Sequence, residues 1–420
     1  MKKFVLSAQS TIAISSLFLV VRSSLAADPV FQNFFFDACV NPAGVLAVRC
    51  GETPGGTGDL SGNSESSLNP SQPLSSQSAA LGLARDRTRE VSETIAELRD
   101  QNADKQHPGT SQADELSIGP ISLLINGRKT WYDQNREVSD AERGLDGDIW
   151  EVELGFDYRI TDRTLFGGFL GYETTDADYN KDEAGVNFTP QQNSGQISSD
   201  SYTLTVFGSY NFTDSLYLEA SAGYGATNYT FKRNVVFQES TRTIPQTNVR
   251  TTADADGEQY WGSASMGYNF NRDAFSVGPY ARVTYVKSTV DDYTEKDTSS
   301  SGLQMGVELD ERTSVTTDFG ISASYAIGMG WGVLVPQARV EWEHEYDQDA
   351  QTITTLYVLD ANQNRFALKG DNPDRDYFNV GAGISAIFPH GWTGFVNYTG
   401  LVGYEDLSRH QVTAGVRVEF

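Results

Sequence analysis

Residue clusters that could perform chemistry are few in this sequence of 420 residues. Of its 4 histidines, only His344 lies among carboxylates, in the run Glu343-His344-Glu345. A histidine between two carboxylates could act as a general base or as a metal ligand. On an extended strand, however, His344 points to the same side as Trp342, two residues earlier. We therefore interpret His344 as an outward-facing interfacial residue rather than a base or a ligand.

Catalytic sequence motifs are absent. The sequence has no Gly-x-Ser-x-Gly nucleophile elbow, no Gly-Asp-Ser-Leu block, no metalloprotease helix motif and no phosphate-binding loop. Acidic pairs such as Asp291-Asp292 and Asp310-Glu311 could hold Ca²⁺ or Mg²⁺, but solvation of surface loops is the simpler explanation. We expect no enzyme activity, no cofactor and no resident metal. A net charge of -25 also excludes general nucleic-acid binding, which needs a basic surface.

The N-terminus has the three parts of a secretory signal peptide. Lys2 and Lys3 form a basic start, Thr11 to Val21 an apolar core, and Ser24-Leu25-Ala26 a small-residue cleavage site. An uncleaved anchor helix is the alternative, but this core is shorter than the roughly 20 residues that a spanning helix needs. We expect residues 1–26 to be removed on export. No later stretch is long and apolar enough to span as a helix, so any later membrane segment must be a β-strand.

Cys39 and Cys50 are the only cysteines of the chain. Because both follow the export signal, an oxidising periplasm would join them in a disulfide. Metal binding is the weaker alternative, since no histidine or third cysteine stands near them. The surrounding residues 27–73 are rich in Gly, Ser, Pro and Asn and predict a short flexible segment that contains the cysteine pair.

Residues 74–104 predict one helix. Ser75 or Ser76 can cap it, apolar residues recur every three or four positions, and the rest of its surface is charged. A solvated surface helix or a short coiled coil would fit this pattern, and so would a helix inside a polar pore. At 1.5 Å per residue, such a helix spans roughly 42 Å, enough to cross an outer-membrane barrel. Its candidate contacts with an acidic pore wall are Arg85, Arg87 and Arg89.

From Ile118 onward, apolar residues recur at every second position instead of every third or fourth, as they do in a β-strand. In the segment Trp150 to Ile160, apolar residues alternate strictly with Glu151, Glu153 and other polar residues. A soluble sandwich could use one apolar face, but charges in mid-strand and aromatics at strand ends favour a membrane barrel with a wet lumen. Twelve segments are long enough to cross: 119–130, 147–160, 165–174, 200–212, 216–231, 258–271, 274–288, 312–327, 332–345, 376–388, 392–403 and 410–420.

The charged residues on the polar faces of these strands are the candidates for lining the lumen. They are Glu151, Glu153, Asp157, Arg159, Arg282, Arg339, Glu341, Glu343 and Arg417. Because confined carboxylates attract cations, this wall would bind the arginines of the helix, which favours a plugged pore over an open, cation-selective one.

The connections between the strands alternate in length. Long polar loops, near 133–146, 175–199, 232–257, 289–311 and 346–375, separate five tight turns, among them Thr161-Asp162-Arg163 and Pro389-His390-Gly391. Outer-membrane barrels show this alternation, with short periplasmic turns and long extracellular loops. The predicted fold is therefore all-β: a 12-stranded antiparallel transmembrane barrel, with a preceding helix in its lumen and a short N-terminal segment.

Three stretches resemble the β-domain of autotransporters, the family of type V secretion. They are GVLVPQARVEWEHEY (332–346), FNVGAGISAIFPHGWTGFVNYTGLVGYED (378–406) and the terminal VTAGVRVEF, which ends on Phe420. The resemblance covers residues 117–420, and it implies that Phe420 belongs to the signal for the barrel-assembly machinery. Two features depart from the family: residues 27–73 are too few for a β-solenoid passenger, and the helix has no Asn-Asn pair for cleavage in the lumen.

The function predicted from these observations is that of an autotransporter-type barrel in the outer membrane of a Gram-negative cell. It would anchor a short N-terminal segment and display it through the lumen at the cell surface. The alternative is a stand-alone barrel whose long extracellular loops mediate adhesion or surface binding, and an enzyme at the barrel rim is less favoured. The expected partners are outer-membrane lipids, lipopolysaccharide and the assembly machinery, and we expect a monomer.

Overall fold

The computed structural model describes residues 29–60, 62–104, 119–135, 142–238, 243–297, 299–347 and 349–420. The expected signal peptide, residues 1–26, lies outside this part of the chain. Among the described residues, no helix combines the length and the apolar character needed to cross a membrane.

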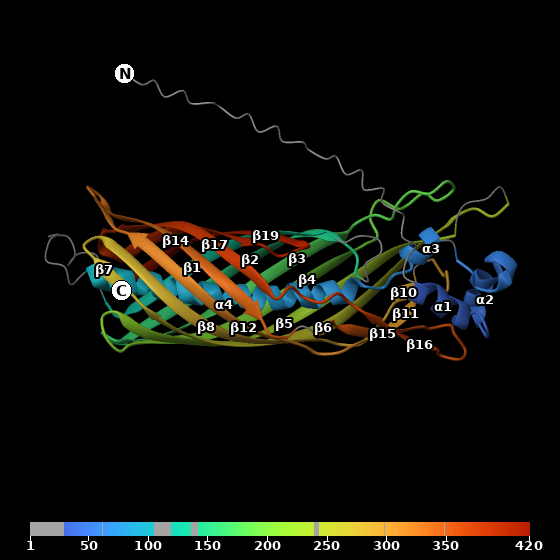
Figure 1. The fold of residues 1–420 in the computed structure, drawn as a ribbon, viewed down its shortest axis with the longest axis horizontal. Coiled ribbons are helices and arrows are strands. Elements are labelled where there is room, and N and C mark those ends of the chain that lie inside the picture. Colours follow the sequence, from blue (N-terminus) through green and yellow to red (C-terminus); the bar gives the residue numbers. More distant parts are fainter. Residues whose placement is uncertain are drawn as a thin grey trace, which may run out of the picture.

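Twelve antiparallel strands close into a barrel, which confirms the predicted fold class (Figure 1). Each strand pairs with its neighbours along the chain, and β19 pairs with β1 to close the ring. Each of the twelve predicted segments corresponds to one of these twelve strands. The strands are β1 (Ile121–Gln134), β2 (Leu145–Thr161), β3 (Thr164–Tyr179), β4 (Gly195–Asn211), β5 (Leu216–Phe237), β6 (Thr247–Tyr268), β8 (Phe275–Val290), β12 (Arg312–Tyr325), β14 (Gly332–Glu345), β17 (Asp376–Phe388), β18 (Trp392–Val402) and β19 (Leu407–Glu419).

The two faces of the barrel wall differ as the alternation in the sequence predicts. In β1, Ile121, Leu123 and Ile125 are exposed on the outside, whereas Asn126 and Arg128 are buried inside. An exposed apolar belt of this size is costly in water but stable in lipid. Aromatic rings border the belt at both ends, as in outer-membrane barrels; exposed examples are Trp131, Trp150, Tyr172, Tyr202 and Tyr260 at one end and Tyr210, Phe212, Tyr268, Phe270 and Trp392 at the other.

Short turns gather at one end of the barrel and long connections at the other. The short-turn end carries β7 (Phe270–Arg272), β13 (Ile327–Met329) and the 3-10 turn η3 (Pro389–Gly391). The last strand also ends there, since Val418 of β19 pairs with Trp392 at the start of β18. The predicted alternation of turns and loops is therefore present.

The predicted long loops are partly strands, and in this respect the sequence prediction was wrong. Strands β5 and β6 each have 22 residues, about twice the 9–11 that crossing requires. Their outward residues beyond the lipid belt are polar, for example Asp254, Asp256 and Glu258, so the apolar alternation that marks a membrane strand is missing there. Further strands in the loops are β10 (Lys296–Asp297), which pairs with β6, and a four-stranded sheet of β9 (Tyr293–Thr294), β11 (Met305–Leu309), β15 (Thr352–Tyr357) and β16 (Arg365–Lys369).

Helix α4 (Gln72–Asp104) runs through the barrel along its axis (Figure 1). It begins two residues before the predicted start and ends at the predicted residue. Two of its apolar residues, Val91 and Ile95, pack against wall residues, among them Phe169, Phe207 and Phe395. The lumenal position of the helix, predicted from its length and charge, is confirmed.

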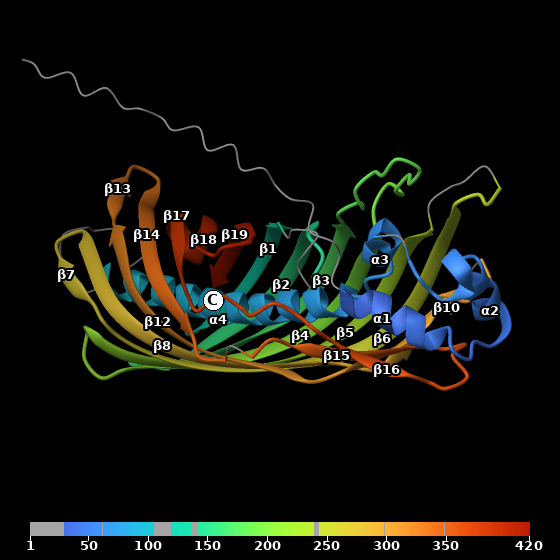
Figure 2. The ribbon, with the colours of Figure 1, turned by 45° about the vertical axis from the view of Figure 1, so that its right-hand side comes forward.

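The N-terminal segment is not the flexible linker that its composition predicts. It contains α1 (Pro29–Ala38), α2 (Gly44–Gly51), the 3-10 turn η1 (Pro54–Gly56) and α3 (Gly62–Ser67). These elements lie at the long-connection end of the barrel (Figure 2). They share a hydrophobic core with β5, β6 and the loop strands, which are distant in sequence. Residues 29–60 and 62–71 are called the cap below.

Candidate functional site

The candidate site is the lumen around helix α4, called the plug helix below. Arg85, Arg87 and Arg89 lie in adjacent turns of this helix. Residues four apart share a helix face, whereas residues two apart point in nearly opposite directions. Arg85 and Arg89 therefore reach β14, and Arg87 reaches β2 and β3 on the opposite wall.

Arg89 connects the plug helix to β14 through two carboxylates. Its Nε lies 2.6 Å from Glu341 Oε2, and its Nη2 lies 3.0 Å from Glu343 Oε2. Arg85 donates from Nη1 to the Tyr377 hydroxyl at 2.7 Å and to Glu345 Oε2 at 3.1 Å. All these acids are almost fully buried. Because charge-assisted hydrogen bonds strengthen when water is excluded, these contacts fix both the depth and the rotation of the helix.

Arg87 makes the contacts on the opposite wall. Its Nε lies 3.2 Å from Glu151 Oε1, its Nη2 pairs with Glu173 on β3, and Gln259 accepts a hydrogen bond from Nη1 at 3.3 Å. The guanidinium carbon lies 5.3 Å from the centre of the Trp261 ring, which adds a cation–π contact. Since each donor group has a partner, the charge of Arg87 is compensated in an almost fully buried site.

Charges of the barrel wall complete the network. Arg128 of β1 lies 3.0 Å from Glu151, 3.7 Å from Glu153 and also pairs with Glu90 of the helix. Arg282 bridges Asp318 at 3.1 Å and Glu341 at 3.0 Å. Two further pairs lie along the lumen: Arg339 with Glu93 of the helix, and Arg417 with Asp157 at 3.0 Å. Arg159 is half-buried near the short-turn end of β2 and joins none of these pairs among the described residues.

The structure brings together most of the charges proposed from the sequence and adds others. Arg128, Glu173 and Glu345 could have been found, because the same alternation of exposed and buried residues places them on the lumenal face. Asp86 and Glu90 could not have been found from the sequence, because a charged helix surface does not show which of its acidic side chains contact the barrel wall. Asp86 lies 2.5 Å from Arg89 and 3.1 Å from Arg409 of β19.

His344 lies outside this network, on the outer surface of the barrel. Its Nδ1 lies 2.7 Å from Asp376 Oδ1, and its ring lies beside those of Trp342 and Tyr346 with centre distances of 5.8 and 4.7 Å. This position fits the interfacial interpretation. Within the described ranges, no group of three or more His, Cys, Asp or Glu side chains is arranged to hold a metal ion.

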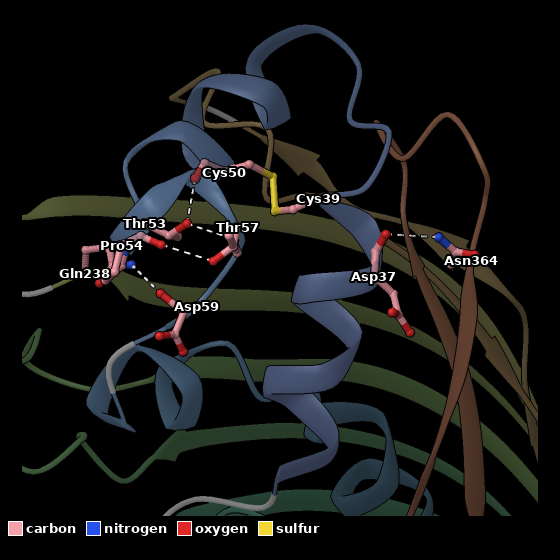
Figure 3. Close-up of a disulfide and its surroundings, with 10 residues drawn as sticks. Asp37, Cys39, Cys50, Thr53, Pro54, Thr57, Asp59, Gln238 and Asn364 are labelled. Atoms are coloured by element: carbon pink, nitrogen blue, oxygen red, sulfur yellow. Dashed lines mark hydrogen bonds between the residues drawn. A yellow bond between two sulfur atoms is a disulfide. The ribbon is translucent and has the colours of Figure 1, made fainter.

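The two cysteines lie in the cap, where a disulfide joins them (Figure 3). Their Cα atoms are 5.5 Å apart, and the bond connects the end of α1 with α2. Thr53 supports this turn: its hydroxyl donates to the Cys50 carbonyl at 2.6 Å and accepts from the Gly58 amide at 2.7 Å. Asn364, in the connection after β15, donates to the Asp37 carbonyl at 3.3 Å and so joins the cap to a loop (Figure 3).

Phe420, the proposed assembly signal, lies at the short-turn rim. Its amide donates to the Ile121 carbonyl at 2.8 Å, which extends the closure between β19 and β1 by one residue. The residue is 57% exposed on the outside, so it is accessible at this rim.

Comparison with known proteins identifies the family. The autotransporter β-domain model matches residues 124–399. Esterase EstA of Pseudomonas aeruginosa is 25% identical over 253 residues, which cover 59% of this chain and 35% of the esterase. Outer membrane protein B of Rickettsia japonica is 18% identical over 318 residues, 74% of this chain and 18% of that protein. The chain thus spans well under half the length of these curated relatives.

The translocator domain of the autotransporter NalP from Neisseria meningitidis has a similar fold. The likeness covers 80% of this chain and 98% of that domain, with a TM-score of 0.54 and 14% sequence identity. The matched family region spans more than half of the chain and runs from β1 into β18, eleven of the twelve barrel strands. The lipid-facing belt agrees with a place in the outer membrane. The chain belongs to the autotransporter β-domain family and is an outer-membrane autotransporter barrel that holds an N-terminal helix in its pore.

Proposed function

We propose that the barrel anchors the cap at the cell surface, with the plug helix as the connection through the lumen. One observation carries this proposal: the helix passes through the barrel from the cap, at the long-connection end, toward the short-turn end where β1 begins. Long connections of outer-membrane barrels face the outside of the cell. A segment joined to the N-terminal end of this helix is therefore on the outside.

A second candidate function is surface binding by the long connections themselves. The extended ends of β5 and β6 and the four-stranded loop sheet offer a large ordered surface beyond the lipid belt. In this alternative the N-terminal segment would stay in the periplasm. The position of the cap among the long connections favours display instead.

We further propose that this chain is an anchor and not an enzyme. One matched relative is an esterase, but the alignment covers only 35% of it, and the sequence contains none of the nucleophile motifs discussed above. The buried carboxylates and arginines of the lumen are paired with one another, an arrangement that positions a helix rather than activates a substrate.

The proposed partners follow from the surface of the barrel. Lipids and lipopolysaccharide would contact the apolar belt and the aromatic rings at the outer rim, and the assembly machinery would bind the terminal strand with Phe420. Closure of β19 on β1 leaves neither of these strands as an open edge, which is consistent with a monomer.

Labelling of one added cysteine at a time on intact cells tests the display, because Cys39 and Cys50 are joined to each other and offer no free thiol. Val48 of the cap is 52% exposed, and Asp162 in a short turn is also exposed. A membrane-impermeant maleimide should label V48C on intact cells, whereas D162C should react only after the outer membrane is permeabilised. Labelling of V48C that also requires permeabilisation would place the cap in the periplasm and favour the second candidate function.

A further inference from the structure

The cap lies on a surface made by three connections at the outer end of the barrel. They are the far ends of β5 and β6 (231–237 and 247–255), residues 291–297 and 299–311, and residues 351–369, together called the loop cradle. We propose that the loop cradle is a docking site for this chain's own N-terminal segment, and that the docked cap is a fixed lid over the outer mouth. This inference rests on the proposed display of the cap and adds that the displayed segment stays bound.

Aromatic stacking forms the centre of the docking surface. The ring of Phe34 in α1 lies 3.7 Å from that of Phe366 and 5.1 Å from that of Tyr357, measured between ring centres. The neighbouring Phe35 is fully buried against Tyr357 and Phe237, at 5.5 and 5.6 Å. Large rings in such pairs contribute more than their buried area alone. Burial of two adjacent phenylalanines is possible only while the cap is docked.

The fit is close at α2 as well. Leu46 is fully buried, and a Cβ added to Gly302 of the cradle would lie 2.7 Å from its backbone nitrogen. Gly302 has a φ of +82°, a conformation that side chains rarely adopt. Asp297 fixes this loop by accepting hydrogen bonds from Ser299, Ser301 and Gly302. Partial burial alone would raise the pKa of Asp297, but these hydrogen bonds outweigh it and hold the pKa below its usual value.

A buried ion pair joins the cradle to the end of the cap. Arg233 of β5 binds Glu295 through two hydrogen bonds of 2.8 and 2.5 Å. Its remaining donors reach the carbonyls of Leu303 at 3.0 Å and of Leu68, in the cap, at 3.4 Å. The cap completes the coordination of this guanidinium, which would otherwise lie at an open surface. Because a forked arginine pair is directional, it sets the register of docking as well as its strength.

Main-chain hydrogen bonds join the cap to the turn between β15 and β16. The Ala43 amide donates to the Leu359 carbonyl at 2.8 Å, and the Ala361 amide donates to the Asn41 carbonyl at 3.3 Å. Between them Pro42 and Asp360 form an antiparallel bridge. The bridge is isolated and lies outside the strands of the loop sheet, and with the two flanking hydrogen bonds it fixes the cap against this turn.

The residues that join the cap to the plug helix are held in place by burial and hydrogen bonds. Residues 68–72 are all buried. Ser67 accepts a hydrogen bond from the Val236 amide at 2.8 Å, Ser71 accepts one from the Arg143 amide at 3.1 Å, and Tyr179 donates to the Gln72 carbonyl at 2.9 Å. The cap cannot leave the cradle without breaking these contacts at the start of the helix. The lid therefore also holds the outer end of the plug helix.

Two variants of the full chain, each with one added cysteine beside the disulfide-bonded Cys39 and Cys50, test the lid in intact cells. Ser67, 1% exposed, is the last residue of α3 and contacts β5, and a thiol is close to a hydroxyl in size; Val48, 52% exposed, lies in α2 of the cap. With an impermeant maleimide, S67C should react at least about tenfold more slowly than V48C, because a buried thiol reacts only through local opening. Equal labelling rates of S67C and V48C would overturn the proposal that the cap stays docked, but not the proposal that it is displayed outside the cell. Reaction of neither variant until permeabilisation would overturn display itself, and the lid with it.

A second pair of variants tests the loop cradle directly. R233A removes the ion pair beneath the cap, and K232A changes the neighbouring residue, whose ammonium group points to Gln196. In the S67C background, R233A should raise the labelling rate toward that of V48C, and K232A should leave it unchanged. Heat-modifiable migration on a gel shows whether each barrel has folded. If R233A folds and S67C still reacts at its unchanged rate, the assigned role of the cradle is overturned. If R233A does not fold, the comparison of S67C with V48C still tests whether the cap stays docked.

Discussion

At the residue scale, Arg87 illustrates what holds the plug helix. Its carboxylate partners lie on β2 and β3, and the nearer of them along the chain, Glu151, is 64 residues away. Desolvation of such a charge is costly, and only a complete set of partners offsets it. A change at one member of the network therefore affects more than one interaction.

Replacement of Arg87 with methionine should destabilise the protein by about 3–5 kcal/mol, because it removes the cation that the buried Glu151 and Glu173 share and leaves Glu151 with Arg128 alone. The barrel should then lose its compact gel migration at a lower temperature than the natural chain. The double variant R87M/E173M should recover part of the loss, since it removes one uncompensated acid. The matched control is R163M in an exposed turn, which should behave like the natural chain. Equal stability of R87M and R163M would contradict the proposed role of the ion pairs.

The cysteine pair gives a second prediction at this scale. Protein isolated from cells and alkylated without reductant should show two fewer alkyl groups by mass than the reduced and alkylated sample. The physical reason is the oxidising compartment that an exported cap meets, together with the 5.5 Å separation of the two Cα atoms in the folded cap. Modification of both thiols without reductant would show that the bridge is not formed in cells.

At the scale of single elements, the last strand closes the barrel and the helix fills it. Both faces of β19 are in use: Arg417 pairs with Asp157 in the lumen, and Val416 is exposed toward lipid. A shift of β19 by one residue in its pairing register would point Arg417 toward the lipid, so only one register is stable.

Arginine at Val416 should prevent assembly. A lipid-facing arginine costs up to roughly 2–4 kcal/mol, depending on its depth in the bilayer. Removal of Phe420 should also prevent assembly if its exposed ring is the recognition signal. The assay is heat-modifiable migration, with V416A as the control that keeps an apolar surface. Normal migration of V416R and of the truncated chain would contradict the role assigned to this strand.

Removal of the plug helix, residues 74–104, should raise the single-channel conductance of the purified barrel in planar bilayers. The helix occupies the lumen and is held there by ion pairs on opposite walls, so the natural chain should pass little current. A helix of this charge would be expensive in lipid, which leaves the lumen as its stable place. Equal conductance with and without the helix would show that the lumen is closed by something else.

At the scale of the whole molecule, the cap, the loop cradle and the helix form one continuous structure outside the lipid belt and within the lumen (Figures 1 and 2). The cradle exists only when the barrel has brought its three connections together. Docking of the cap is therefore expected to follow assembly of the barrel. A change that affects docking need not affect the barrel.

The substitution G302V should impair docking of the cap without impairing assembly of the barrel. A Cβ there would meet the backbone of Leu46, so the cap should become more sensitive to added protease on intact cells. The barrel should keep its heat-modifiable migration, because Gly302 lies outside the barrel strands. The control is G328V: Gly328 lies in β13 at the short-turn end and has no atom within 4 Å of the added Cβ position. Equal protease resistance of G302V and G328V would contradict close packing between the cap and the cradle.

The sequence by itself determined the barrel, its strand number and the lumenal helix. Alternation between apolar and polar residues, as from Trp150 to Ile160, is imposed locally by lipid on one side and water on the other. The same alternation placed Glu151, Glu341 and Arg417 on the inner face. These features could be predicted because they depend on the surroundings of each strand rather than on particular partners.

Only the tertiary structure decided which charges meet and whether the N-terminal segment is ordered. Pairs such as Arg89 with Glu341 join residues 252 positions apart, so they depend on the rotation and depth of the helix. The composition of the cap predicts a linker because it has too few apolar residues for a core of its own. Phe34, Phe35 and Leu46 become buried because β5, β6 and the loop strands supply the rest of the core. A core shared between distant segments leaves no periodic signal in either segment alone.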